Sequence, residues 1–180
     1  MEVLTIIFLS IILVCLFFIW FLSTFNRFQE LIIRMNEAES NIDATLRKRF
    51  DLLNKAASII RTSLKKEDVL NIIENIRSKK LSNFDLDRQL YEAINEFESL
   101  KLDHKELKKI EEFKKTDLLL QETESEIVAF RKYYNDIITI YNKMVKSFPT
   151  LLVALSYHYK SKLYYDGKDM SDDDIEDMKV

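Results

Sequence analysis

Apolar residues fill the first part of the chain and then thin out into a regular stripe. Residues 3–22, VLTIIFLSIILVCLFFIWFL, contain no charged side chain. Farther along, apolar side chains recur every three or four residues, which is the repeat of one helix face. The stripe positions are Ile42, Leu46, Arg49/Phe50, Leu53, Ala57, Ile60 and Leu64. This pattern predicts a helix that continues from the apolar run without interruption.

A second apolar stripe indicates a helix near the carboxyl end. It consists of Ile127, Phe130, Tyr134, Ile137, Tyr141, Met144 and Phe148. The pattern predicts one long helix from about His104 to Phe148, with Asp103 as its candidate N-cap. Pro149 lacks a backbone donor, so the helix is expected to break there. The tyrosine-rich segment 151–165 follows, and two placements are open: at membrane headgroups, or simply capping the helices.

Two shorter helices are expected between the long ones. Residues 66–80 and 84–101 each place apolar side chains on one face, and residues 79–83 favour a turn. Two long helices flanking two short ones must run antiparallel if their apolar faces are to close on each other. The chain has one Gly and one Pro, too few for the tight turns of a sheet. The predicted fold class is therefore all-α: an N-terminal transmembrane helix followed by an antiparallel bundle of three to four helices.

The uncharged run has the length of a transmembrane helix. Its 20 residues match a hydrocarbon core about 30 Å thick, and Trp20 suits the interface. The alternative, a cleaved signal peptide, would have a positive amino-terminal region, but the only charged side chain before the run is Glu2. We therefore predict a transmembrane anchor at 1–22, a helical domain at 23–165 and an acidic, disordered tail at 166–180.

Lysine and arginine near the ends of a span indicate its orientation, because the cytoplasmic side usually carries the excess. The amino side has none, whereas Arg27 and Arg34 follow the carboxyl side. We therefore expect the N-terminus outside and the helical domain in the cytoplasm. The formal net charge is −3, but the acidic tail alone carries −5 and Glu2 carries −1, so residues 23–165 come to +3, which is close to neutral for a domain of this size. Such a domain lacks the basic surface typical of nucleic-acid binding.

Three polar residues stand inside the second stripe: Arg131, Asn135 and Asn142. One interpretation is a polar patch that recognises a partner. The other is a packing role, in which Arg131 pairs with Asp43 or Asp51 on the first long helix and the asparagines fix the register. The packing role is our prediction, and either aspartate is within reach.

The sequence lacks the residue patterns that di-iron sites in helical bundles, zinc sites and phosphate-binding glycine loops require. A di-iron bundle needs Glu-x-x-His on two helices, but neither histidine has a glutamate three residues before it. One cysteine, Cys15 within the apolar run, and two distant histidines cannot form a zinc site. A phosphate-binding glycine loop needs more than one glycine. We therefore expect no enzymatic activity, no cofactor and no metal.

Two blocks of the sequence carry distinctive motifs. The block 41–53, NIDATLRKRFDLL, has an Ile-Asp pair, a basic cluster and an Asp-Leu pair. The block 120–149, LQETESEIVAFRKYYNDIITIYNKMVKSFP, has Leu-Gln, two Tyr-Asn pairs and Phe-Pro. These two blocks resemble the signature and the later block of the LemA family. The candidate motif residues are Asp43, Arg47, Arg49, Asp51, Glu124, Arg131, Asn135, Asn142 and Pro149. Glu39 departs from the family, which usually has Trp there. The resemblance implies a single-pass membrane protein with a helical bundle and no established catalytic activity.

The predicted function is that of a membrane-anchored scaffold or adaptor, held in the lipid bilayer by residues 3–22, that binds other membrane or membrane-associated proteins. A homo-oligomer, with the second stripe paired as a coiled coil between chains, is a further binding hypothesis. The alternative from a different class is a small-molecule-binding accessory subunit of a membrane enzyme or transporter. That alternative needs convergent polar groups in a concave site.

Overall fold

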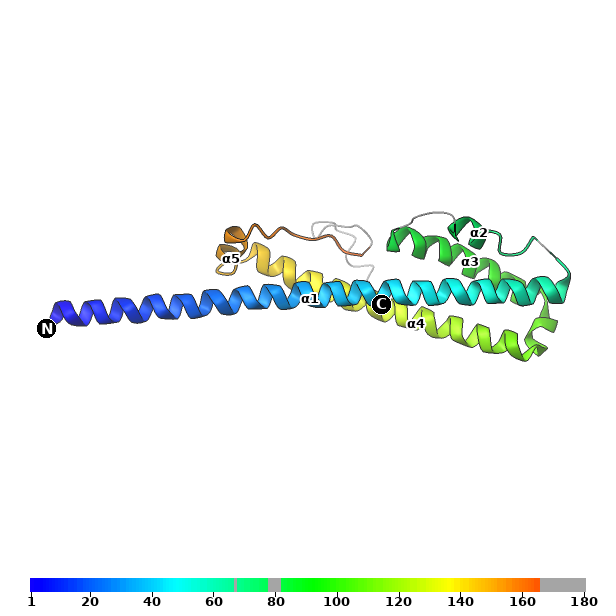
Figure 1. Ribbon diagram of the computed structural model, residues 1–180, viewed down its shortest axis with the longest axis horizontal. Coiled ribbons are helices and arrows are strands. Elements are labelled where there is room, and N and C mark those ends of the chain that lie inside the picture. Colours follow the sequence, from blue (N-terminus) through cyan, green and yellow to red (C-terminus); the bar gives the residue numbers. More distant parts are fainter. Residues whose placement is uncertain (67, 78–81, 166–180) are drawn as a thin grey trace. The chain divides into compact units, whose positions relative to one another are not determined.

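The structure, a computed structural model, describes residues 1–66, 68–77 and 82–165. These residues form five α-helices and one 3-10 helix, η1, and none of them lies in a strand (Figure 1). The elements are α1 (Glu2–Leu64), α2 (Ile72–Arg77), α3 (Asn83–Asp103), η1 (Lys105–Lys109), α4 (Glu111–Lys146) and α5 (Leu151–Ser156). The all-α prediction is confirmed. Most of the turn predicted at 79–83, and the acidic tail at 166–180, lie outside the described residues.

Helix α1 passes from the apolar run into the first stripe without a break. Its 63 residues span about 95 Å at 1.5 Å per residue. No Gly or Pro lies in this stretch, so no residue withholds a backbone donor or favours a turn. The uninterrupted helix expected from the sequence is therefore confirmed.

The chain packs as two compact units. Unit 1 comprises Met1–Glu37 and Tyr134–Val180, and unit 2 comprises Ala38–Tyr133. Unit 1 therefore contains the first part of α1, the last turns of α4, and α5. Unit 2 contains the remainder of α1 together with α2, α3, η1 and the first turns of α4.

The core of unit 2 is built from the inner faces of its three longer helical segments. Its fully or almost fully buried apolar residues include Ile42, Leu46, Leu53 and Ile60 of α1, Leu90, Ala93 and Phe97 of α3, and Phe113, Leu120 and Ile127 of α4. On each helix these positions follow the three-and-four spacing, so each helix buries a single face. The rings of Phe97 and Phe113 stack with their centroids 5.3 Å apart.

The two short helices expected in the middle are present with different lengths. Helix α2 covers six residues of the predicted 66–80, while α3 extends beyond the predicted 84–101 at both ends. The side chain of Ser82 caps α3 by accepting a hydrogen bond from the backbone N–H of Asp85 at 3.2 Å. Between α1 and α2, the guanidinium of Arg61 donates to the carbonyl oxygen of Val69 through Nε and Nη2. That contact holds the connection against the end of α1.

The start of α4 differs from the prediction. Helix α3 continues to Asp103, which therefore closes α3 and does not cap α4. The 3-10 helix η1 follows, and its Leu107 is fully buried. Ile110 then takes an extended conformation, so α4 begins at Glu111 and not near His104. The corner contains no Gly or Pro, and burial of Leu107 in the core explains why the chain turns there.

The helix break predicted at Pro149 is confirmed, since α4 ends at Lys146. The hydroxyl of Thr150 lies 2.6 Å from the carbonyl oxygen of Met144 and 2.9 Å from that of Ser147. These contacts supply a partner to carbonyl groups that the helix end leaves without an intrahelical donor.

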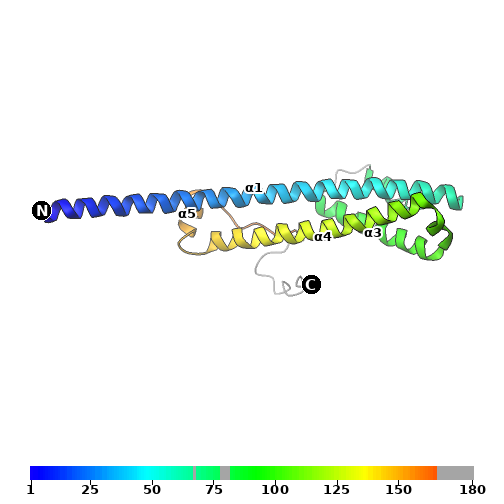
Figure 2. The same ribbon diagram turned by 90° about the horizontal axis from the view of Figure 1, so that it is seen from below.

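In unit 1, α4 runs antiparallel to α1 and packs along it (Figures 1 and 2). The buried residues of this core are Phe28, Leu31, Met35, Ile137, Ile138, Tyr141, Val145, Val153, Ala154 and Tyr164. Helix α5 and the segment after it contribute the last three of these residues. The carboxyl-terminal segment therefore completes the core of unit 1.

Candidate functional site

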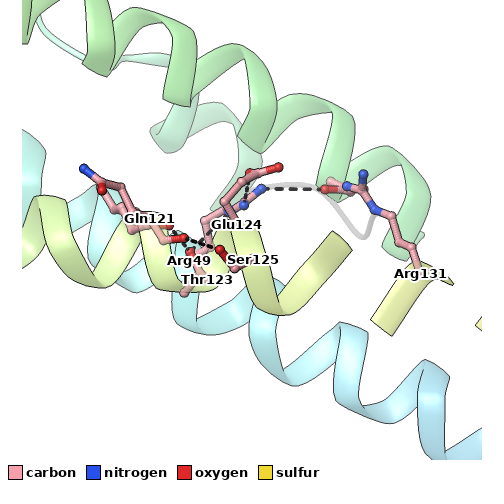
Figure 3. Close-up of polar contacts among 8 residues, drawn as sticks. Arg49, Gln121, Thr123, Glu124, Ser125 and Arg131 are labelled. Atoms are coloured by element: carbon pink, nitrogen blue, oxygen red, sulfur yellow. Dashed lines mark hydrogen bonds and ion pairs between the residues drawn. The ribbon is translucent and has the colours of Figure 1, made fainter. Parts of the chain in front are cut away.

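The guanidinium of Arg49 lies in the core of unit 2, although arginine is a surface residue in most proteins. Its side chain is 1% exposed. It donates a hydrogen bond to the carboxylate of Glu124, and its Nε lies 3.5 Å from Oγ1 of Thr123 (Figure 3). A buried cation is costly unless opposite charge and acceptors surround it. The contacts with α4 therefore stabilise Arg49 inside the core.

Asp87 of α3 stands between Arg49 and a second arginine. Its carboxylate accepts a hydrogen bond from Arg131 of α4, and its other oxygen lies 3.9 Å from Nη1 of Arg49. Only 7% of the Asp87 side chain is exposed. Burial raises the pKa of Asp87 above its ordinary value of 3.8, while the positive charges of Arg131 and Arg49 oppose that shift. We call Arg49, Asp87, Glu124 and Arg131 the charge cluster.

The charge cluster links the three longer helical segments of unit 2 with balanced charge. Two guanidinium groups face two carboxylates, and charge-assisted hydrogen bonds of this kind are short and directional. Among the residues that the structure describes, no group of three or more His, Cys, Asp or Glu side chains could hold a metal ion. Each guanidinium of the cluster is in contact with a carboxylate that neutralises it, which is consistent with a packing role for Arg131.

The partner predicted for Arg131 is wrong. Arg131 pairs with Asp87 and not with the expected Asp43 or Asp51. Asp43 instead accepts a hydrogen bond at 2.8 Å from Arg47, one turn farther along α1. Asp51 is exposed. The prediction considered two antiparallel helices only, whereas a third helix, α3, brings the carboxylate to Arg131.

Two buried charged residues of α3 were missed from the sequence. The buried positions of this helix are Asp87, Leu90, Ala93, Phe97 and Lys101. Their spacing is that of one helix face, so a charged residue at a stripe position was the signal that could have revealed them. Lys101 is paired with Glu98 at 2.6 Å and Asp117 at 2.9 Å. Burial acts to lower the pKa of Lys101, but the hydrogen bonds to these carboxylates raise it overall.

Two asparagines of α4 bind the backbone of the carboxyl-terminal segment within unit 1. The buried Asn142 donates through Nδ2 to the carbonyl oxygen of Lys162 and accepts through Oδ1 from its N–H, both at 2.8 Å. Oδ1 of Asn135 accepts from the N–H of Tyr165 at 2.9 Å. A side-chain amide has an N–H donor and an oxygen acceptor, so it can pair with both the carbonyl and the N–H of a backbone residue. A neighbouring β-strand pairs with these groups in the same way. These bonds run to the segment, whereas the prediction assigned the asparagines to helix register.

Aromatic rings connect α1 with the segment after α5 in unit 1. The ring of Tyr157 lies 4.5 Å from that of Phe25, centroid to centroid. The ring of Tyr159 lies 4.8 Å from that of Phe28. Burial, with a smaller effect of Tyr159, raises the pKa of the Tyr141 phenol above its ordinary value of 10.0. The segment is therefore attached by ring packing as well as by the asparagines.

The apolar run at the start of α1 has no protein cover. Each residue from 3 to 19 is exposed, including the free cysteine Cys15. The helix is long and apolar enough to cross a membrane, so the run is a candidate membrane span. Two other motif residues also lie at the surface, since Phe148 and Pro149 are both exposed.

Comparison with family models assigns the chain to a known family. The model of the LemA family matches residues 38–178, which is most of the chain. The chain belongs to the LemA family. The resemblance inferred from the two sequence blocks is therefore confirmed. No curated protein matches this chain.

The two LemA blocks of this chain meet in the charge cluster of unit 2. The first block supplies Arg49, and the second supplies Glu124 and Arg131. Asp87 comes from the region between them. The second block continues into unit 1 with the two asparagines that bind the carboxyl-terminal segment, and it ends at Pro149. In this LemA protein Arg49, Glu124, Arg131, Asn135 and Asn142 thus have contacts that hold elements together. Asp43 and Arg47 pair with each other within α1, and Asp51 lies at the surface.

Proposed function

We propose that this LemA-family protein is a single-pass membrane-anchored scaffold or adaptor that mediates protein–protein interactions at the membrane and performs no catalysis. The observation that carries the proposal is the unbroken exposure of the apolar residues 3–19. Burial of one large apolar side chain is worth about 1.5–3 kcal/mol, so leaving this run in water would be very costly. A hydrocarbon layer about 30 Å thick fits a helix of this length.

The proposed orientation places the N-terminus outside and the helical domain in the cytoplasm. Arg27 and Arg34 follow the run, and no lysine or arginine precedes it. Both arginines pair with Glu30, at 2.8 and 2.6 Å. The orientation rule counts lysine and arginine and gives acidic residues little weight, so the pairing leaves the bias in place.

An apolar face of α3 supports the adaptor role. Tyr91 and Leu102 are exposed and lie eleven residues apart, about three helical turns, which places them on one side of the helix. The opposite side of α3 carries the buried residues of the unit 2 core. Exposed aromatic and aliphatic side chains gathered on one face are typical of protein-binding surfaces.

Membrane attachment can be tested with lysines in the run. Ile11→Lys combined with Leu13→Lys should remove the protein from the membrane fraction, because each lysine at the bilayer centre costs about 2.5–3.5 kcal/mol. Ile33→Lys combined with Leu102→Lys is the matched control at exposed apolar positions outside the run. The control and the wild type should stay in the pellet after an alkaline carbonate wash. Release of the wild-type protein by carbonate would contradict the anchor.

The adaptor role can be tested by photocrosslinking in cells. A crosslinking amino acid at Tyr91 or Leu102 should give discrete adducts, and one at the exposed Lys115 of α4 should give none. Adducts that contain a second copy of the chain would favour self-assembly, which size measurement in detergent checks. Equal, diffuse background at all three positions would count against an adaptor.

A further inference from the structure

In unit 1, the end of α4 lies level with the end of the apolar run. The two helices are antiparallel there (Figure 2). The rings of Phe28 and Tyr141 meet edge to face with their centroids 5.7 Å apart. Five residues along α4 from Tyr141 is Lys146, the last residue of the helix. Five residues back along α1 from Phe28 is Ser23, which directly follows Leu22 at the end of the run. Equal steps along antiparallel helices place Lys146 and Ser23 at the same level.

The segment after α5 lies at this level too. The ring of Tyr157 packs against Phe21 and Phe25, with centroids 6.2 and 4.5 Å apart. In a bilayer whose hydrocarbon core holds residues 3–22, the headgroup layer extends roughly 5–7 Å beyond Leu22. The turn between α4 and α5, and α5 itself, therefore fall at the depth of the headgroups.

The surface at this level is apolar. Phe148 is 79% exposed and Leu155 is 64% exposed, and Leu152 is exposed between them. Val153 and Ala154 of the same short helix are buried in the core of unit 1. Helix α5 therefore covers the core with one side and presents large apolar side chains outward with the other.

The carboxyl-terminal part of unit 1 that forms this surface carries positive charge only, within residues 137–165. Residues 137–165 contain no aspartate or glutamate. Their four lysines, Lys143, Lys146, Lys160 and Lys162, are all exposed. Lysine and tyrosine beside exposed apolar side chains is the composition of segments that lie in a membrane interface. Anionic lipid headgroups attract such lysines within a Debye length of the surface.

We propose that Phe148, Leu152 and Leu155 form a second membrane contact, which inserts into the leaflet from which α1 emerges while the four lysines bind anionic phospholipid headgroups. This inference rests on the proposed membrane anchor. It reconciles the two placements expected for residues 151–165, because the segment both caps the core and faces the headgroups. With a span and an interfacial contact, unit 1 is held at a fixed tilt and rotation relative to the bilayer.

Single-cysteine labelling of the full chain tests the contact. Phe148→Cys and Ile33→Cys are made in a Cys15→Ser background, labelled with an environment-sensitive dye, and reconstituted in phosphatidylcholine vesicles with and without phosphatidylglycerol. Ile33 is the matched control, because it is an exposed apolar residue of unit 1 eleven residues, about 16 Å, beyond Leu22. At the Phe148 position, iodide should quench several-fold less than at the Ile33 position, and nitroxide lipids should quench strongly. Phosphatidylglycerol should strengthen both effects.

Labelling the native Cys15 reports separately on the span. A Cys15 label quenched by nitroxide lipids, together with a Phe148-site label open to iodide, would overturn the second contact and leave the anchor standing. A Cys15 label open to iodide would overturn both. Protection at the Phe148 site without quenching by nitroxide lipids would show a protein cover and also overturn the proposal. Leu155→Cys should repeat the Phe148 result, and circular dichroism checks that each variant keeps its helices.

Discussion

At the scale of single residues, three consecutive basic side chains differ in burial. Arg47 and Lys48 both form ion pairs at the surface, with Asp43 and Glu126, whereas Arg49 is buried. Successive residues of a helix are rotated by about 100°, so a basic run points in several directions. The stripe decides which one is buried, because Arg49 falls between Leu46 and Leu53. The residue types of these three basic positions alone do not indicate which side chain is buried.

The first prediction concerns the burial of Arg49. Arg49→Ala should lower the free energy of unfolding by about 3–5 kcal/mol, because it leaves the buried Asp87 without one of its two cations. Arg47→Ala removes the same side chain two positions earlier and should have little effect. Arg49→Met with Asp87→Leu should recover most of the loss, since it removes both buried charges. Denaturant titration of the full-length protein in detergent measures all three, and equal losses for the two alanine variants would contradict the structural role.

The second prediction concerns pH and Asp87. Because its pKa is raised in the folded protein, the folded state binds this proton more tightly than the unfolded chain. The contribution of Asp87 to stability is therefore fully present below the ordinary pKa of 3.8, and it is lost as the pH rises through the raised value. The stability of the wild type minus that of Asp87→Asn should fall over this range and then level off. A pH series of denaturant titrations measures this, with Asp51→Asn as the exposed baseline. A difference that grows with pH would mean that ion pairing outweighs burial.

At the scale of elements, the carboxyl-terminal segment is held by side chains and not by regular secondary structure. After α5, residues 158–164 are in no helix or strand, yet a buried backbone needs hydrogen-bond partners. Asn142 and Asn135 supply them, and the hydroxyls of Thr139 and Tyr164 lie 3.0 Å apart beside them. The face of α4 therefore serves as a template for this segment.

The third prediction tests that template. Asn142→Ala should free the segment locally, because the N–H and carbonyl of Lys162 lose their partners. Hydrogen exchange should then show much faster exchange at residues 160–165, while the amides of α4 keep their protection. Asp136→Ala, an exposed change on the same helix, is the control and should leave exchange unchanged. Unchanged protection of Lys162 in Asn142→Ala would show that ring packing alone holds the segment.

The elements also show where sequence reasoning succeeds and where it stops. The course of α1 was predictable, because helix formation there depends on local residues and the absence of Gly and Pro. The start of α4 was not predictable, because the turn between α3 and α4 depends on the burial of Leu107 in the core. The partner of Arg131 depends on the relative position of three helices, which no spacing within one helix encodes. Burial of Asp87 was within reach, since it occupies a stripe position.

At the scale of the whole molecule, the usual distribution of polarity is reversed in two places. The amino-terminal run exposes apolar side chains, and unit 2 buries charges. Opposite charges stabilise Arg49 and Asp87, and hydrocarbon would stabilise the run under the proposed membrane anchor. Under that proposal, the orientation of the chain across the bilayer decides which partners the remaining surface can meet.

The last prediction concerns that orientation. A single cysteine at the exposed Leu102, in a Cys15→Ser background, should react with an impermeant maleimide only after cells are opened, because the proposed orientation places the helical domain in the cytoplasm. Arg27→Gln with Arg34→Gln, plus two lysines inserted after Met1, should make part of the protein react in intact cells, since the charge bias is then reversed.

Glu30→Gln provides the matched control for this experiment. Glu30 pairs with Arg27 and Arg34, which hold its pKa below the ordinary value. Replacing Glu30 therefore alters this group of three charged residues without removing a positive charge. If only lysine and arginine set the orientation, Glu30→Gln should label like the wild type. If net charge sets the orientation, the domain of Glu30→Gln should be retained in the cytoplasm even more strongly than that of the wild type. Adding Glu30→Gln to the arginine variant should then partly restore its retention. Labelling of the wild-type domain in intact cells would place the helical domain outside, and it would exclude every cytoplasmic partner at once.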